Sequence, residues 1–402
     1  MPRYQHKRSD RQGRPHFSSR NNYKKRPSKK GATIDPSKFV RSAKPQVEAE
    51  YISTHTFADF KVHNILKDNL RNMGFTQPSP IQDQTIPLGL EGKDVVGIAN
   101  TGTGKTAAFA VPMLNKLMSE PQSKAIVLAP TRELAQQIEE QCRMIGKGSG
   151  IVGTLLIGGV AMGPQLKQLR HRPRLIIGTP GRVKDHLGRK SLKLSDCNII
   201  VLDEVDRMLD MGFVNDIRHI LSETNERKQS FYFSATMDNR VKAIIEGFSH
   251  DPVQVSVKSN ETSDNIEQNI IPFNATADKI DKLHDLLIQE ATAKAVVFDS
   301  THWNVERLSK ELESRGFSAG SIHGGKSQSQ RQRILSKFKD NKISVLVATD
   351  VAARGLDVSD ITHVINYSTP QSYSDYVHRI GRTGRAGKVG HALTFVHAGD
   401  IR

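Results

Sequence analysis

The chain has 402 residues, of which 37% are hydrophobic and 25% are charged. This length exceeds what one hydrophobic core usually supports, so we expect two globular domains. No run of about 18 apolar residues occurs, and the N-terminus lacks the apolar stretch of a secretory signal, so we expect no membrane partner. The two cysteines, Cys142 and Cys197, have no metal-type spacing. They favour a reducing, cytoplasmic setting over a disulfide framework or a zinc site.

The net charge of +16 is concentrated near the N-terminus. Residues 1–30 hold eleven Lys and Arg residues and one acid, Asp10, which gives this segment a net charge of +10. A basic N-terminal arm on a chain whose remaining charges nearly cancel indicates a polyanionic partner. Nucleic acid is favoured over a membrane surface as that partner. A solvated tail that aids solubility is the alternative, and charge alone does not choose between the two.

Two series of short apolar runs follow a polar N-terminal stretch. Residues 1–50 have few aliphatic side chains and cannot bury enough apolar surface to offset their ordering entropy, so we expect a disordered tail. Beyond it, apolar runs alternate with amphipathic stretches, which predicts a parallel sheet covered by helices. In this half of the chain the predicted strands are Asp94–Ala99, Ala125–Ala129, Leu175–Gly178, Ile199–Leu202 and Ser230–Phe233, and the predicted helices include Ala107–Leu117, Glu133–Met144 and Val214–Ser222.

The second series repeats this alternation after a polar stretch, Lys258–Asn265, which we interpret as a linker. The predicted organisation is therefore a tail over residues 1–50, a domain over 51–257, the linker over 258–265 and a second domain over 266–402. The fold class is α/β, with two tandem domains that each hold a mostly parallel sheet. The predicted strands of the second domain are Ala295–Phe298, Ser344–Ala348, His363–Asn366 and Ala392–Val396.

The segment Asp94–Thr106 reads DVVGIANTGTGKT and runs from a predicted strand through a glycine-rich turn into a predicted helix. This context is typical of a phosphate loop, in which backbone N–H groups and the helix N-terminus face the phosphates. We expect Lys105 to reach the β- and γ-phosphates and the Thr106 hydroxyl to hold Mg²⁺. The alternative, a chance glycine-rich turn, is opposed by the flanking strand and helix. The predicted nucleotide-binding residues are Ala99, Asn100, Thr101, Gly102, Thr103, Gly104, Lys105 and Thr106, with Ala99 standing where the general pattern usually has glycine.

An acidic tetrad, Asp203-Glu204-Val205-Asp206, follows the predicted strand Ile199–Leu202 directly. An aspartate at a strand end can hold the metal, and an adjacent glutamate can orient or deprotonate the attacking water. Acids at a strand end are often only helix caps, but the phosphate loop upstream favours catalysis. We therefore predict catalytic roles for Lys105, Asp203 and Glu204.

These residues, together with further motifs in a fixed order, resemble the DEAD-box RNA helicases from about Phe57 to Val396. The stretch GFTQPSPIQ, residues 74–82, resembles the family's Q motif. The resemblance implies two RecA-like domains that bind ATP between them, with Phe57 stacking on adenine and Gln82 reading the adenine edge. A carboxamide has one donor and one acceptor, which complements N6 and N7 of adenine and not N7 and O6 of guanine.

Three segments resemble the family's RNA-binding motifs in the first domain: residues 130–135, 158–159 and 179–182. They offer hydroxyl, backbone and guanidinium donors suited to phosphate contact without base readout. Helix capping and turn formation are the alternative for each segment taken singly. Residues 234–236 resemble the motif that links the ATP state to RNA binding. The implied RNA contacts are Pro130, Thr131, Arg132, Gly159, Thr179 and Arg182, and the implied coupling residues are Asp206, Ser234, Thr236 and His378.

The second domain has matching segments at residues 323–331, 348–358 and 376–387. The resemblance implies that they contact RNA and complete the nucleotide site of the first domain. A solvated or RNA-facing surface is the alternative for the last, basic run. The implied roles are RNA contact by Gly325, Arg331 and Thr349, ribose contact by Asp357, and arginine fingers at Arg382 and Arg385.

One position departs from the family's pattern: the third residue of the tetrad is Val205, where the family has alanine. Two extra methyl groups in a tightly packed place commonly cost about 1–3 kcal/mol, so we expect an effect on rate more than on function. We interpret the chain as a monomeric, cytoplasmic, ATP- and Mg²⁺-dependent enzyme that remodels RNA through its sugar–phosphate backbone. A two-domain DNA helicase and an RNA clamp without useful turnover remain as alternatives.

Deletion of residues 1–30 tests the basic arm. We expect weaker RNA binding with a shallower salt dependence, because fewer cations displace counterions from the phosphates, while kcat at saturating RNA stays similar. Binding titrations over a range of salt concentrations measure the slope, and an unchanged slope would mean that the arm does not contact RNA.

Overall fold

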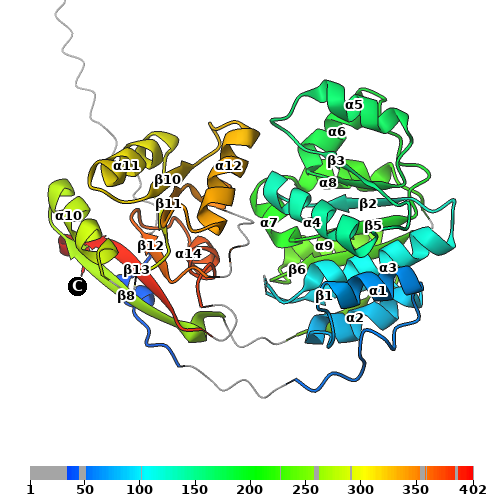
Figure 1. The fold of residues 1–402 in the computed structure, drawn as a ribbon, viewed down its shortest axis with the longest axis horizontal. Coiled ribbons are helices and arrows are strands. Elements are labelled where there is room, and N and C mark those ends of the chain that lie inside the picture. The colour runs from blue at the N-terminus through cyan, green and yellow to red at the C-terminus, as the bar shows by residue number, and fades with distance from the viewer. Residues whose placement is uncertain are drawn as a thin grey trace, which may run out of the picture. The chain divides into compact units, whose positions relative to one another are not determined.

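The computed structural model describes residues 34–44, 51–100, 102–226, 228–257, 262–289, 292–353, 358, 360–384 and 388–401. Figure 1 shows that strands β1 to β7 and β8 to β13 form two separate sheets, each with its own helices. The two-domain α/β class predicted from the sequence is confirmed. Within these described ranges, no helix is long and apolar enough to cross a membrane.

The first domain is built on a seven-stranded sheet with the order β3-β4-β2-β5-β6-β1-β7, in which every neighbouring pair is parallel. The strands at its centre are apolar and buried, because helices cover both faces of the sheet. The strands are β1 (Val95–Ile98), β2 (Ala125–Leu128), β3 (Gly153–Leu156), β4 (Leu175–Gly178), β5 (Ile199–Leu202), β6 (Gln229–Ser234) and β7 (Val253–Ser256).

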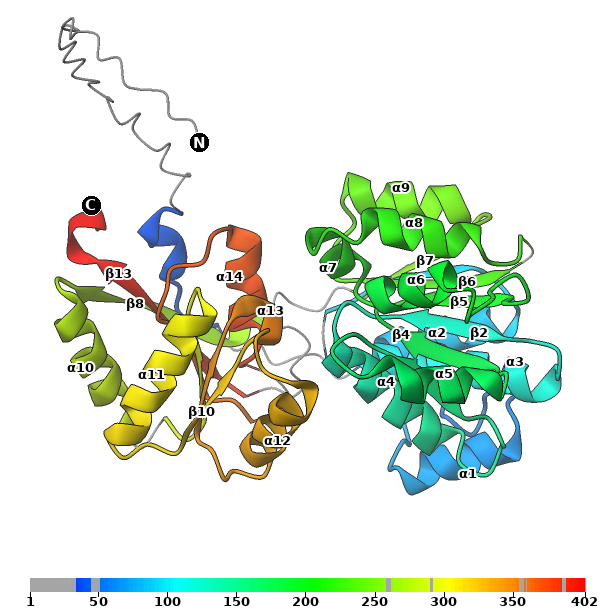
Figure 2. The same cartoon turned by 90° about the horizontal axis from the view of Figure 1, so that it is seen from above.

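Helices formed by the described residues cover both faces of this sheet, as Figure 2 shows from above. On one face lie α1 (Asn64–Asn72), α2 (Pro80–Leu90), α3 (Lys105–Ser119) and α4 (Arg132–Ile145), which bury side chains such as Leu66, Phe109 and Ile138 in one core. The helices that contribute to the second core are α5 (Met162–Arg170), α6 (Pro180–Gly188), α7 (Val205–Asp210), α8 (Val214–Ser222) and α9 (Asn239–Phe248).

The second domain has a six-stranded sheet with the order β10-β11-β9-β12-β13-β8, again parallel throughout. Its strands are β8 (Ile266–Phe273), β9 (Ala295–Phe298), β10 (Ala319–Ile322), β11 (Val345–Ala348), β12 (His363–Asn366) and β13 (Gly390–His397). Helices α10 (Thr276–Leu287) and α11 (His302–Ser314) pack on one face. Further helices are α12 (Gln328–Lys339), α13 (Asp350–Ala353) and α14 (Tyr373–Ile380).

The parallel topology collects the loops after the strands at one edge of each sheet. The phosphate loop follows β1, the acidic tetrad follows β5, and residues 234–236 close β6, all at the carboxyl edge of the first sheet. Ligands of parallel α/β sheets bind outside this edge. The fold therefore places the nucleotide-binding candidates where such sheets bind ligands.

The N-terminal boundary predicted from the sequence is partly wrong. Residues 34–44, which we assigned to a disordered tail, include the 3₁₀-helix η1 (Pro36–Phe39) and a β-bridge from Arg41 to Gln268. The physical reason is Phe39, which is 1% exposed. Burial of this one apolar side chain offsets the entropy cost of ordering an otherwise polar segment. Residues 1–33 lie outside the described residues. Of the predicted linker, residues 258–261 do so too, and Thr262–Asn265 forms the 3₁₀-helix η2.

Gly97 in the middle of β1 tests how closely the first core is packed. A Cβ added there would collide with the ring of Phe233 and approach Ile81, so we expect Gly97→Ala to destabilise the protein by about 1–3 kcal/mol. Gly247→Ala in α9 is the control, because its Cβ would meet nothing within 4 Å and alanine favours the helix. Urea unfolding measures both, and equal stability of the two variants would contradict the packing described.

Candidate functional site

The phosphate loop joins β1 to α3 and depends on two glycines in left-handed conformations. Gly102 and Gly104 have φ values of +87° and +90°, which residues with a Cβ adopt only at a cost. Lys105 begins α3 with its side chain buried, and its Nζ donates to the Ala99 carbonyl at 3.0 Å. Thr106 follows in the first helical turn. Thr101, also predicted to bind nucleotide, lies outside the described residues.

Two side chains at the start of α2 donate hydrogen bonds to the backbone of the phosphate loop. Ser79 Oγ donates to the Thr103 carbonyl at 2.7 Å, and Gln82 Nε2 donates to the Gly104 carbonyl at 3.0 Å. Gln82 Oε1 accepts from Ser79 N at 2.9 Å, which completes a capping box at the helix start. A carboxamide has two N–H groups and two oxygen lone pairs, so Gln82 keeps one of each for a ligand. The role of Ser79 was not predicted, although the spacing of Ser79 and Gln82 is that of a capping box.

Phe57 does not present an open ring face. Its side chain is 4% exposed and lies edge-on to Phe60 and Phe75, with ring centroids 5.7 and 5.3 Å away. The ring belongs to the first core of the domain. Its stacking on adenine stays a prediction, and it requires that the ring become uncovered.

The two acids of the tetrad that follow β5 directly are buried. Asp203 and Glu204 are 2% and 5% exposed, and Glu204 N donates to Asp203 Oδ1 at 3.0 Å. Glu204 has a φ of +55°, which is uncommon for a residue with a side chain and often marks a functional site. Burial raises the pKa of Asp203 to about 6, against the opposing effect of the Lys105 cation. Lys105 therefore lies close enough to the two acids to influence their charge.

Arg207, in the first turn of α7, pairs with Glu204 through its Nη1. Both side chains are almost completely buried. Burial alone would raise the pKa of Glu204, but the Arg207 guanidinium and Lys105 hold it below its ordinary value. The sequence analysis missed Arg207, although its position three residues after Glu204 places the two on the same side of a helix start.

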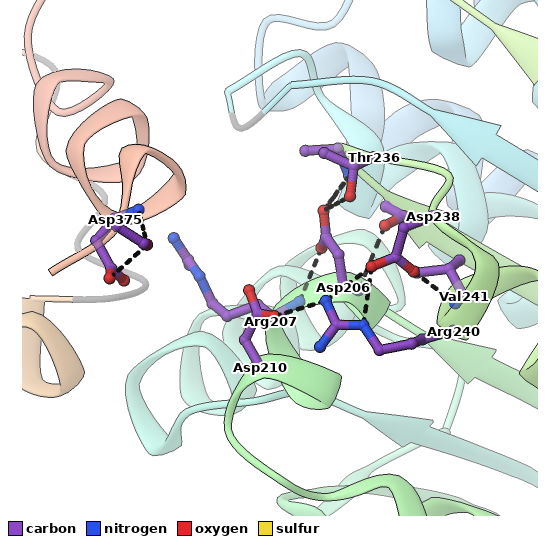
Figure 3. Close-up of polar contacts among 11 residues, drawn as sticks. Asp206, Arg207, Asp210, Thr236, Asp238, Arg240, Val241 and Asp375 are labelled. Carbon is purple, nitrogen blue, oxygen red and sulfur yellow. Dashed lines mark hydrogen bonds and ion pairs between the residues drawn. The ribbon is translucent and has the colours of Figure 1, made fainter. Parts of the chain in front are cut away.

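Asp206 joins the tetrad to the end of β6, as the close-up in Figure 3 shows. Its Oδ2 accepts from Ala235 N at 3.1 Å, Thr236 N at 2.9 Å and Thr236 Oγ1 at 3.1 Å. In return, Asp206 N donates to Ser234 Oγ at 3.3 Å. The three predicted coupling residues of the first domain are thus brought into one hydrogen-bonded group.

Arg240 extends this group to the next helices. Its Nη2 contacts Asp210 Oδ1 at 2.9 Å and Asp238 Oδ2 at 2.7 Å, and Asp238 caps α9 (Figure 3). Helices α7 and α9 are therefore tied together at the segment that follows β6.

The predicted RNA-contacting residues of the first domain lie after β2, β3 and β4, which are neighbours in the sheet. The Arg132 guanidinium packs against Gly159, where any Cβ would collide with it. Arg182 Nη1 donates to the Val160 carbonyl at 3.0 Å. Thr131 also caps α4, accepting from Leu134 N at 3.2 Å, so the capping alternative holds for its side chain. Pro130 and Thr179 complete the set at the same strand ends.

The second domain places its candidates at the corresponding strand ends. Gly325 N donates to His323 Nδ1 at 3.1 Å in the loop after β10. Among the described residues, the buried Thr349 hydroxyl after β11 finds no hydrogen-bond partner, which leaves it available to a ligand. Arg331 lies in the first turn of α12. Asp357 lies outside the described residues.

The basic segment at α14 contains one arginine that is structural. The Arg379 guanidinium donates to both carboxylate oxygens of Asp350, at 2.5 and 2.8 Å. It also donates to Asn366 Oδ1 and to the Ser368 carbonyl. Arg382 is 3% exposed, and its Nε donates to the carbonyl of His378 at 3.3 Å. Arg385 lies outside the described residues.

Comparison with known proteins agrees with this geometry. The DEAD/DEAH box helicase family matches residues 79–244, and the helicase conserved C-terminal domain matches residues 278–387. The chain is 47% identical over 345 residues to the DEAD-box ATP-dependent RNA helicase CshA of Bacillus subtilis, across 85% of this chain and 70% of that protein.

Solved structures give the same result for the fold. S. cerevisiae Dbp5 bound to RNA and ADP BeF3 matches with a TM-score of 0.75 at 30% identity, covering 86% of this chain and 90% of that one. Mss116p bound to ssRNA and AMP-PNP matches with a TM-score of 0.77 at 27% identity, covering 89% and 77%. The chain is thus a two-domain, RecA-like α/β ATPase. It belongs to the DEAD/DEAH box helicases, and within them to the DEAD-box ATP-dependent RNA helicases.

Replacement of Arg207 tests the buried ion pair. Arg207→Leu leaves the Glu204 carboxylate buried beside Lys105 alone, and we expect a loss of about 3 kcal/mol in the free energy of unfolding at neutral pH. Because Arg207 lowers the pKa of Glu204, its stabilisation is present above the ordinary glutamate pKa of about 4.3 and is lost as the pH falls through the lower folded value.

The loss caused by Arg207→Leu should therefore shrink in acid, and adding Glu204→Gln should restore much of the stability. Urea unfolding at neutral pH and at about pH 3, below the ordinary glutamate pKa, measures both effects. A loss that stays constant with pH and is not relieved by Glu204→Gln would contradict the pairing.

Proposed function

We propose that this chain couples RNA-stimulated ATP hydrolysis to local unwinding or remodelling of RNA duplexes. One observation carries the proposal: the buried cation Lys105 at the phosphate loop lies near the buried acids Asp203 and Glu204 and alters the pKa of both. Removing charges from water costs several kcal/mol of folding free energy. Buried charged groups with shifted pKa values are therefore typical of catalytic sites.

We infer that Asp203 and Thr106 hold Mg²⁺. Their carboxylate and hydroxyl oxygens are ligands that Mg²⁺ accepts, and Mg²⁺ in such sites keeps several waters and takes phosphate oxygens from the nucleotide. Within the described part of the chain, no three His, Cys, Asp or Glu side chains gather as a metal site, which fits an ion that needs the nucleotide to complete its ligands. When bound, the ion supplies neutralisation of charge on the transferring phosphate.

The roles at the γ-phosphate follow from charge. Lys105 contacts the phosphate, and Glu204, kept ionised by Arg207, orients and deprotonates the attacking water. Arg382 and Arg385 act as arginine fingers from the second domain when ATP and RNA bring the domains together. Asp206, Ser234, Thr236 and His378 transmit the nucleotide state to the RNA site.

The nucleotide is held by the phosphate loop and by base contacts. Ala99, Asn100, Thr101, Gly102, Thr103 and Gly104 offer backbone groups to the phosphates. The remaining amide capacity of Gln82 reads the adenine edge, Phe57 stacks on the base, and Asp357 contacts the ribose.

RNA is recognised through its backbone and with little sequence preference. The carboxyl-edge loops offer guanidinium, hydroxyl and N–H groups, and the partnerless Thr349 hydroxyl supports such a contact. The residues assigned to RNA are Pro130, Thr131, Arg132, Gly159, Thr179, Arg182, Gly325, Arg331 and Thr349. The two buried free thiols, Cys142 and Cys197, support a cytoplasmic location.

Paired variants of Glu204 and Arg382 test the proposed mechanism. Glu204→Gln removes the base but keeps size and polarity, so we expect hydrolysis to fall by about 10²–10⁴-fold while RNA stays tightly bound with ATP. Arg382→Ala removes a finger that contributes about 10³–10⁵ in rate, and we expect it to lose both hydrolysis and ATP-dependent retention of RNA. Phosphate release and RNA dissociation with ATP measure the two effects, with Lys105→Ala as an inactive control.

Equal RNA dissociation rates for Glu204→Gln and Arg382→Ala would contradict these separate roles. Stimulation of wild-type ATPase by DNA and not by RNA would instead favour a DNA helicase. RNA binding without any stimulated phosphate release would favour the RNA clamp, in which Val205 slows the chemistry.

A further inference from the structure

The segment that precedes the first domain in the chain is packed on the second domain. Phe39, at the end of η1, is 1% exposed and packs with Ile266 of β8, Tyr376 and Ile380 of α14 and Val396 of β13. The Phe39 and Tyr376 ring centroids are 4.8 Å apart. Burial of a phenylalanine side chain contributes roughly 1.5–3 kcal/mol, so this contact anchors an otherwise polar segment.

Polar contacts fix the same segment along β8, the edge strand of the second sheet. Arg41 and Gln268 exchange two backbone hydrogen bonds, of 3.0 and 2.8 Å, in an antiparallel bridge. Ala43 N donates to Glu267 Oε2 at 2.7 Å, and the Arg41 guanidinium contacts Asp264. The Gln268 side chain accepts from the Tyr376 hydroxyl at 2.9 Å, which holds the receiving surface in shape. We call residues 34–44 in this position the clasp.

The chain is anchored to the first domain again a few residues later. Tyr51 Oη and Thr54 N donate to Asp83 Oδ2, each at 2.7 Å, and His55 N donates to Asp83 Oδ1 at 3.2 Å. Asp83 lies at the start of α2 and is 3% exposed. From Lys44 to Tyr51 the chain advances seven residues, so these anchors can separate by at most about 25 Å.

The linker after β7 is a second short connection. Val257 N donates to the Ile98 carbonyl at 3.0 Å on the first domain, and the chain rejoins described structure at Thr262. Five residue steps allow a separation of at most about 18 Å. Lys44 N donates to the Asp264 carbonyl at 2.8 Å, so both connections leave the second domain at the same place.

We propose that the clasp makes residues 45–50 a second tether between the two domains, which limits how far and in which directions they separate. This inference goes beyond the proposed function but depends on it for its effect on activity. A single connection permits wide separation and free twisting of the two domains, whereas two short connections exclude most of those open arrangements. The open state then loses less entropy when ATP and RNA close the domains.

Two changes loosen the proposed tether by different routes. Phe39→Asp places a charge in the apolar contact and should release the clasp. Insertion of about twenty Gly and Ser residues between Lys44 and Tyr51 leaves the clasp and its contacts unchanged but makes the tether slack. Val40→Asp is the matched control, because Val40 is the next residue and is 53% exposed.

We expect both loosened variants to raise the KM for RNA by about threefold to tenfold. Each doubling of the length of the chain that connects two sites makes their approach about threefold less favourable. The kcat at saturating RNA and ATP should stay near that of the wild type, and Val40→Asp should change neither value. RNA-stimulated phosphate release measures all four proteins.

A second readout does not require activity. Dyes on Ser195→Cys and Ser314→Cys report the distance between the domains by energy transfer, since the native thiols Cys142 and Cys197 are buried. Without ligands, both loosened variants should show longer and more widely distributed distances than the wild type and Val40→Asp. An insertion variant with the wild-type distance distribution overturns the tether, even when Phe39→Asp has an effect. If the wild type lacks RNA-stimulated hydrolysis, the proposed function fails, and the distances still decide on the tether.

Discussion

The first domain depends on balancing four charges that it removes from water. Lys105, Asp203, Glu204 and Arg207 are each less than 8% exposed. An uncompensated charge in such a place costs several kcal/mol, whereas two cations beside two acids keep the cost tolerable. The carboxyl edge of the first sheet is therefore held in one arrangement, with the lysine at the start of α3, after the loop that follows β1, and the acids directly after β5.

A buried charge also fixes the start of the first domain, where residues 51–55 contact the carboxylate of Asp83. Asp83 is nearly buried, and burial opposes its ionisation, yet the contacts from Thr54, Tyr51 and His55 lower its pKa below the ordinary value. Asp83 stands next to Gln82, which supports the phosphate loop. The first turn of α2 thus holds both the segment that begins the first domain, through Asp83, and the phosphate loop, through Gln82.

The sequence predicted the interior of both sheets and missed their borders. All nine predicted strands exist, whereas the four that were not predicted, β3, β7, β8 and β10, are the edge strands. Central strands such as β2, β5 and β9 have helices on both faces and are continuously apolar, while β7 and β8 alternate between buried and exposed positions and β10 contains Gly320 and Ser321. Motif residues were easier to locate, because their loops follow the central strands.

What the sequence could not supply was which side chains become buried and which partners they then contact. Arg207 was overlooked because its role arises from burial beside Glu204, and the packing of Phe57 depends on the tertiary contacts of Phe60 and Phe75. The order of residues 34–44 depends on side chains more than 200 positions away, such as Tyr376. Composition describes the segment itself and carries no information about that surface.

The clasp also has a consequence for how the protein is made. Its receiving surface includes Ala392 and Val396, which belong to β13, the last strand that the structure describes. Synthesis proceeds from the N-terminus and domains generally fold as units, so the first domain can form while that surface does not yet exist. Phe39 must remain without its partner until β13 has been synthesised, about 350 residues later. Docking of the clasp would then follow the synthesis of both domains, and a ribosome-bound chain would expose this phenylalanine to chaperones throughout that time.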